Sequence, residues 1–105
     1  MEAQYFEAIK NRLVDASPAI SSGKMMRSEA ITYKGKVFAF FSTKQKLVVK
    51  LGKAFDPNTV DYELKLFQPF KRKGPLNGWF EISFAEKHHW EALAYQALNL
   101  LQLEL

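Results

Sequence analysis

The sequence contains no cysteine. Disulfide bonds, catalytic thiolates and thiolate metal sites are therefore excluded. Because small secreted domains commonly depend on disulfides, their absence favours a cytoplasmic location. Long hydrophobic runs are missing too, since the longest, at residues 37–41, falls far short of the ~20 residues that a membrane-spanning helix needs. The acidic, amphipathic residues 1–5 lack the basic start and apolar stretch of a signal peptide.

Motifs for catalysis and for phosphate binding are also missing. No Walker-type or dinucleotide-binding glycine pattern occurs, and no serine stands in a Gly-x-Ser-x-Gly sequence. The only histidines are His88 and His89. Neighbours on an α-helix point about 100° apart, so this pair lacks the i, i+4 spacing at which two histidines of one helix share a metal ion. We therefore expect no catalytic residue, no metal ligand and no cofactor, and we interpret the chain as non-enzymatic.

The composition is that of one ordinary globular domain. The chain has 105 residues, of which 48% are hydrophobic and 25% are charged. That length closes a single, thin hydrophobic core. We expect one domain over residues 1–105.

Positive charge is concentrated in one part of the chain. The formal net charge is +4, but residues 24–53 alone hold eight bases and a single acid, Glu29. Such a segment can attract nucleic acid or another polyanion. Alternatively, its lysines keep the exposed side of a sheet hydrated and protect the sheet edges from aggregation. We favour the second interpretation.

Hydrophobic periodicity predicts a helix followed by an antiparallel meander. Phe6, Ile9 and Leu13 form one apolar stripe, which indicates a helix over residues 2–16. Pro18 ends it, and residues 21–23 are expected to form a loop. Strands are predicted at 30–34, 37–42 and 46–51, joined by short turns, with Gly35 permitting a positive φ in the first turn. The strand at 37–42 is apolar on both faces and should be central.

The sequence of the second half of the chain predicts a short helix, two strands and a final helix. Asp56 and Pro57 suit the start of a short helix over residues 57–63. Further strands are expected at 65–70 and 79–84, and a final helix at 85–103. The predicted fold class is α+β, a two-layer, five-stranded antiparallel sheet with helices packed on it, in the order α-β-β-β-α-β-β-α.

The loop at residues 71–78 is the most distinctive local feature. It begins with three consecutive bases and continues with a Gly-Pro pair. One interpretation is a site for an anion or a partner, because binding residues concentrate on loops. The other is a structural crossing between two strands, fixed by the Gly-Pro pair and Trp79, and we favour it.

Five short segments, taken in their order along the chain, resemble those of a known family. They are GKM at 23–25, ITYKGKVFA at 31–39, KLVVKL at 46–51, GPLNGW at 74–79 and HWEALAYQAL at 89–98. Together they are similar to the TfoX/Sxy N-terminal domain family. The residues that carry the resemblance, and to which it implies a structural role, are Lys24, Met25, Gly35, Lys36, Gly74, Pro75, Trp79 and Trp90.

This resemblance implies a fold of the type α-β(3)-α-β(2)-α and no catalytic residue. Met26 and Arg27 stand where the family usually has Phe-Gly, so the backbone there is expected to differ. The full-length TfoX regulators, which are bacterial proteins, promote competence for DNA uptake and carry a C-terminal helical domain. We expect a stand-alone N-terminal domain.

Two functions from different classes follow from these observations. The first is a regulatory domain that binds a protein partner, or a second copy of itself, through the doubly apolar strand. The alternative is a nucleic-acid-binding module that uses residues 24–53 and the loop at 71–73. Its candidate contacts are Lys34, Lys36, Lys46, Lys50, Lys71, Arg72 and Lys73. No contact with a membrane is expected.

Overall fold

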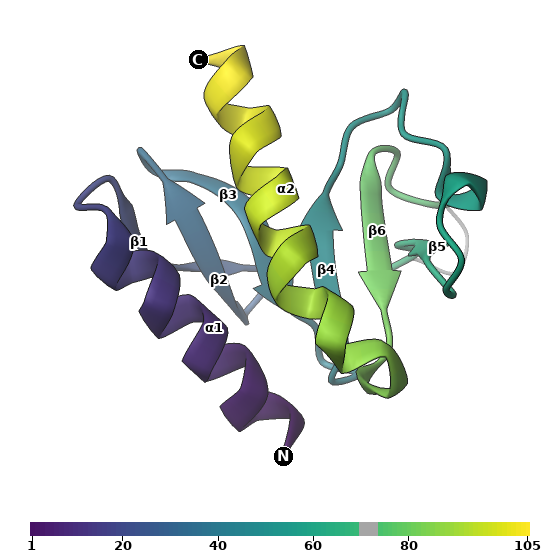
Figure 1. Cartoon of the computed structure of the whole chain (residues 1–105), viewed down its shortest axis with the longest axis horizontal. Helices are drawn as coiled ribbons and strands as arrows, with labels where there is room; N and C mark the ends of the chain where they lie inside the picture. The colour runs from purple at the N-terminus through teal and green to yellow at the C-terminus, as the bar shows by residue number, and fades with distance from the viewer. Residues whose placement is uncertain (70–73) are drawn as a thin grey trace.

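The protein folds into a six-stranded antiparallel sheet with two α-helices on one of its faces (Figure 1). The structure, a computed structural model, describes residues 1–69 and 74–105. The helices are α1 (Glu2–Ala16) and α2 (Trp90–Glu104), and the strands are β1 (Ile20–Met25), β2 (Ser28–Tyr33), β3 (Lys36–Phe41), β4 (Leu47–Lys50), β5 (Lys65–Leu66) and β6 (Trp79–Ile82). The strand order is β1-β2-β3-β4-β6-β5. The predicted α+β class with an antiparallel sheet is confirmed, but the number of strands, five, was wrong.

The additional strand is β1, where the sequence predicts a loop. Residues 26 and 27 have φ angles of 49° and 69°, which is the conformation of a two-residue hairpin turn. This turn folds β1 back onto β2, so that Met25 pairs with Ser28 and Gly23 pairs with Ala30. The Ser-Ser-Gly sequence was interpreted as a loop because small polar residues are common in loops. Here these residues belong to an edge strand.

Gly23 is required by the close packing of this hairpin. A Cβ atom at position 23 would lie 2.7 Å from Cγ2 of Thr32 on the neighbouring strand. We therefore expect Gly23→Ala to lower the free energy of unfolding by about 1–2 kcal/mol, because the added methyl group overpacks the hairpin. Urea denaturation measures this change. Ser22→Ala, on the same strand but exposed, is the control and should stay within about 0.5 kcal/mol of the wild type. Equal stability of the two variants would contradict this packing.

Several other predicted elements are shorter than expected, among them the strand at 79–84, which ends at Ile82. The helix at 57–63 is only a 3-10 turn, η1 (Pro57–Thr59), in which the Asp56 carboxylate accepts a hydrogen bond from the backbone N–H of Asn58. The strand at 65–70 is reduced to β5, and residue 70 lies outside the described residues. The final helix was expected from residue 85, but the chain first forms a short 3-10 helix, η2 (Phe84–His89), and regular α-helix begins at Trp90. The predicted helix at 2–16 is confirmed by α1.

The main core lies between the sheet and the two helices. α1 contributes Phe6, Ile9 and Leu13, and α2 contributes a stripe that includes Leu93 and Leu101; all five side chains are buried. β3 is confirmed as a central strand, since it pairs with β2 on one side and β4 on the other. The strand is buried on both faces. One of them faces the helices, and the other belongs to a second, smaller apolar cluster.

Candidate functional site

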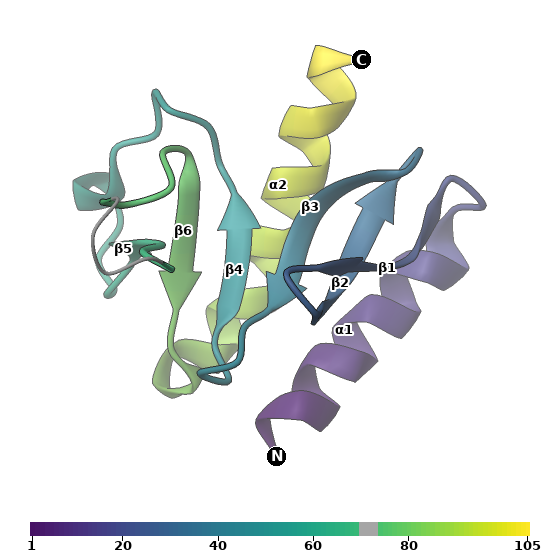
Figure 2. The same cartoon turned by 180° about the vertical axis from the view of Figure 1, so that it is seen from behind.

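The second apolar cluster lies on the sheet face that the helices leave free, which we call the open face. Figure 2 shows this face in front, with α1 and α2 behind the strands. Its buried members are Ala30, Phe40, Val48 and Phe67. Cross-strand pairing accounts for three of them, because Ala30 pairs with Phe40 and Phe40 with Val48, and directly paired residues point to the same face. The register therefore creates an apolar row across three strands.

The segment that follows β5 covers part of this row. The backbone N–H of Phe67 donates to the carbonyl of Trp79 (2.8 Å), and the N–H of Leu76 donates to the carbonyl of Phe67 (2.8 Å). These bonds bring Phe67 to Phe40, with ring centroids 5.3 Å apart, and the Trp79 ring lies 5.6 Å from the Phe40 ring. Trp79 is half-buried and packs against this cluster, and the structural role that the sequence suggests for it stays a prediction.

Next to the part of the row that this segment covers lies a cavity of about 230 Å³. Its lining residues come from the tips of two hairpins, β1–β2 and β3–β4, and from residues 67–69. Phe40 and Phe67 supply apolar walls, and Met26 at the turn is 45% exposed. The other lining residues are mostly polar: Ser28, Ser42, Thr43, Lys44, Gln68, Pro69 and Glu81. We call this cavity the open-face groove.

One base and one acid line the open-face groove, and further bases lie close to it in sequence or by strand pairing. Lys44 lines it, and Arg27 follows the lining residue Met26 at the hairpin tip. Glu81, the one acid in the lining, is partly neutralised by Lys46, whose Nζ lies 3.7 Å from a carboxylate oxygen. Lys65 pairs with Glu81 across β5 and β6, and its ammonium lies 3.6 Å from Glu63. Among the described residues, Lys44 is thus the one base in the lining, and both Lys46 and Lys65 lie beside carboxylates.

The structure separates the predicted anion contacts. Lys46 lies at the groove end of the sheet, whereas Lys34 and Lys36 flank the turn at the other end of β3. Lys34 Nζ lies 5.4 Å from the centroid of the Tyr33 ring, and Lys50 Nζ lies 3.9 Å from a carboxylate oxygen of Glu104 on α2. The three bases at 71–73 lie outside the described residues. The described candidates therefore do not form a single patch.

The residues that carry the resemblance lie in different parts of the fold. Gly35 adopts φ = 82° in the β2–β3 turn, which confirms the predicted need for a positive φ there. Gly74 likewise has a positive φ, of 73°. Met25 packs against the open-face cluster, and Trp90 is fully buried in the main core. Lys24 is exposed on β1, and Pro75 precedes the hydrogen-bonded Leu76.

A buried ion pair links α1 to the hairpin, which sequence periodicity did not reveal. The Lys10 ammonium donates to Glu29 on β2 and lies 3.1 Å from Glu7, while only 8% of its side chain is exposed. Burial opposes the charge of Lys10, but its hydrogen bonds to Glu29 and Glu7 outweigh burial, so the pKa of Lys10 is raised. The hydrogen bond from Lys10 lowers the pKa of Glu29 below its usual 4.5.

This ion pair predicts a stability change in acid. Because the pKa of Glu29 is lower in the folded protein, the unfolded chain takes up the proton first, starting near pH 4.5. The stabilisation is therefore present at neutral pH and is lost as the pH falls through the folded pKa. Glu29 is partly exposed, so we expect Glu29→Gln to remove up to about 1 kcal/mol of this pH dependence. Urea denaturation between pH 3 and pH 7 measures it, and an unchanged profile would contradict the pair.

The comparisons with known proteins leave the function open. Neither family models, nor curated proteins, nor solved structures give a match to the chain. The resemblance to the TfoX/Sxy N-terminal domain family therefore stays a prediction. Within the described residues, neither helix combines the length and the apolar character that crossing a membrane would require.

Proposed function

We propose that this domain is a non-enzymatic interaction module whose open-face groove binds an apolar, acidic segment of a partner protein. The observation that carries the proposal is the combination of an apolar floor, made by Phe40 and Phe67, with Lys44 in the lining and Arg27 at the adjoining hairpin tip. Exposed apolar surface bordered by polar residues is typical of protein interaction sites. A regulatory role of this kind also agrees with the resemblance to the TfoX/Sxy N-terminal domain, and with a cytoplasmic location.

The dimensions of the open-face groove favour a peptide side chain over a small-molecule substrate. Its volume of about 230 Å³ is below the ~300–1,000 Å³ of ordinary ligand pockets. It is large enough for one bulky side chain of a partner. Among the described residues, the groove also lacks a convergent set of catalytic groups. Glu81 forms an ion pair with Lys46, and the Ser42 hydroxyl oxygen accepts a hydrogen bond from the backbone N–H of Lys46.

The charges around the groove favour an acidic partner. Arg27 and Lys44 stand on the two hairpin tips and have no carboxylate among the ion pairs of the described residues. Complementary charges at the rim of an interface raise the association rate and fix the orientation of the partner. We expect acidic residues on either side of the apolar anchor.

Selection from a displayed library of random 12-residue peptides tests this function. We expect selected peptides to carry a Leu, Met or aromatic residue flanked by Asp or Glu. In ¹⁵N–¹H spectra, a selected peptide should shift the signals of Met26, Ser28 and Lys44. Selected peptides without acids, or shifts confined to α1 and α2, would contradict the proposal. Self-association of the domain through the same groove would show as dimers in sedimentation, and would replace the acidic peptide as the occupant.

The nucleic-acid alternative is tested by the anisotropy of labelled single- and double-stranded DNA. Since the described candidate lysines lie at opposite ends of the sheet or pair with carboxylates, we expect only weak binding at low salt. Micromolar binding with a steep dependence on salt concentration would favour the alternative instead.

A further inference from the structure

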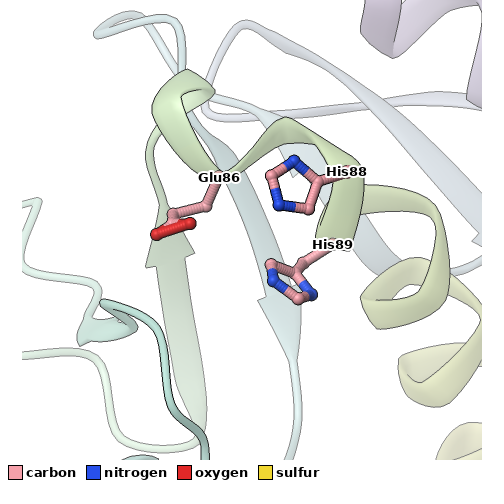
Figure 3. Close-up of side chains that lie close together, drawn as sticks. All are labelled: Glu86, His88 and His89. Atoms are coloured by element: carbon pink, nitrogen blue, oxygen red, sulfur yellow. The ribbon is translucent and has the colours of Figure 1, made fainter.

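The segment η2 brings together three side chains of the types that bind metal ions. Glu86 itself has non-helical angles, φ = −105° and ψ = 31°, and kinks the segment. The His88 and His89 rings lie 4.7 Å apart. One ligand atom each of Glu86, His88 and His89 lies within 4.8 Å of the others, and Figure 3 shows the three side chains gathered at this turn.

Neighbouring residues hold this turn in place. The indole N–H of Trp90 donates to the carbonyl of Ser83 (3.0 Å), and the backbone N–H of Glu86 donates to the same carbonyl (3.0 Å). These two bonds tie the start of α2 to the end of β6. The His89 ring stacks on Tyr62, with centroids 3.9 Å apart and planes at 12°. The turn is therefore held by hydrogen bonds to Ser83 and by the stacking of His89 on Tyr62.

The one base within this turn is directed elsewhere. The Lys87 ammonium lies 5.0 Å from the centre of the Phe84 ring and 5.8 Å from that of Tyr5, which is the range of a cation–π contact. It thereby leaves the side occupied by the histidines. Two imidazoles and one carboxylate would face a cation there.

We propose that Glu86, His88 and His89 form a surface site for a divalent transition-metal ion of the zinc class. Imidazole nitrogen and carboxylate oxygen are the donors that Zn²⁺ and its neighbours prefer, whereas Ca²⁺ and Mg²⁺ require oxygen alone. Three protein ligands leave at least one coordination position for water or an external ligand. This site is independent of the open-face groove. The sequence prediction of no metal ligand assumed an α-helical first turn, and that turn is not α-helical.

Calorimetric titration of the purified domain with Zn²⁺ alone tests the site. We expect one ion per chain. Removing one ligand should weaken binding by at least the factor of about ten that loss of a supporting residue costs at metal sites. The variants are Glu86→Gln, His88→Ala and His89→Phe, the last of which keeps an aromatic ring to stack on Tyr62. Combining His88→Ala with His89→Phe should abolish binding.

Glu91→Gln is the matched control. Glu91 lies near the cluster in sequence, but its carboxylate accepts two hydrogen bonds from the Arg12 guanidinium. We expect this variant to bind Zn²⁺ as the wild type does. Absorption spectra with Co²⁺ give a second readout, because imidazole coordination changes the d–d bands. No Zn²⁺ binding by the wild type, or equal binding by the control and the histidine variants, would overturn the proposal; circular dichroism verifies that each variant is folded.

Discussion

Trp90→Ala is expected to lower the free energy of unfolding by about 3–5 kcal/mol, because it empties the largest fully buried site in the protein. The indole ring makes edge contacts with Tyr5 of α1 and Phe84, at centroid distances of 5.8 and 5.7 Å, and a tilted contact with Phe41 of β3. It therefore joins both helices to the sheet. Domains of this size are stabilised by about 5–15 kcal/mol in total, so the variant should be close to unfolding.

Trp90→Phe separates packing from hydrogen bonding at the same position. The phenyl ring keeps most of the aromatic contacts but loses the N–H that bonds to Ser83. We expect this variant to lower the free energy of unfolding by a smaller amount, about 1–3 kcal/mol. Part of this loss arises because the carbonyl is left without its hydrogen-bond partner. Urea denaturation followed by circular dichroism gives both values. A cost below about 1 kcal/mol for Trp90→Ala would contradict the central position of this ring.

Phe40→Ala should lower the free energy of unfolding by about 3–5 kcal/mol, although Phe40 lies on the face away from the helices. Phe40 is 1% exposed and packs against both Phe67 and Trp79. Its removal takes away the floor of the open-face groove and the surface on which the segment after β5 rests. Phe40→Leu is the control, since it keeps most of the volume and should cost less than about 1.5 kcal/mol.

The two outcomes at Phe40 distinguish two descriptions of the open face. A large cost means that the second cluster is a packed part of the core, on which the groove is a fixed feature. If Phe40→Ala instead changes the free energy of unfolding by no more than about 0.5 kcal/mol, as at an exposed position, the open face is only loosely covered. The description of the groove as a fixed feature would then be wrong.

The sequence predicted those parts of the fold that rest on strong periodicity. The stripe of Phe6, Ile9 and Leu13 located α1 at its observed bounds, and the doubly apolar run of β3 located the centre of the sheet. The prediction failed at β1. The Ser-Ser-Gly residues form a strand because they pair with β2 and because Gly23 packs against Thr32, and neither interaction is local in the sequence.

The candidate sites were less predictable than the fold. The open-face groove depends on hydrogen bonds between Phe67, Leu76 and Trp79, which no spacing in the sequence indicates. The resemblance drew attention to Gly74, Pro75 and Trp79, none of which lines the groove. The cluster at Glu86 was missed because a kinked 3-10 helix replaces the expected α-helical turn. A Glu-x-His-His sequence before an apolar helix was the available signal.

The central claim, that the open-face groove and not positive charge in general binds the partner, is tested most directly by two matched charge reversals. Lys44→Glu changes a groove residue, and Lys36→Glu changes an exposed lysine at the opposite end of β3. The measurement is the affinity of each variant for a selected acidic, apolar peptide. We predict that Lys44→Glu weakens binding by about tenfold, equivalent to ~1.4 kcal/mol, while Lys36→Glu leaves it within about twofold. Equal losses in both variants would mean that net charge attracts the peptide, and would contradict the account.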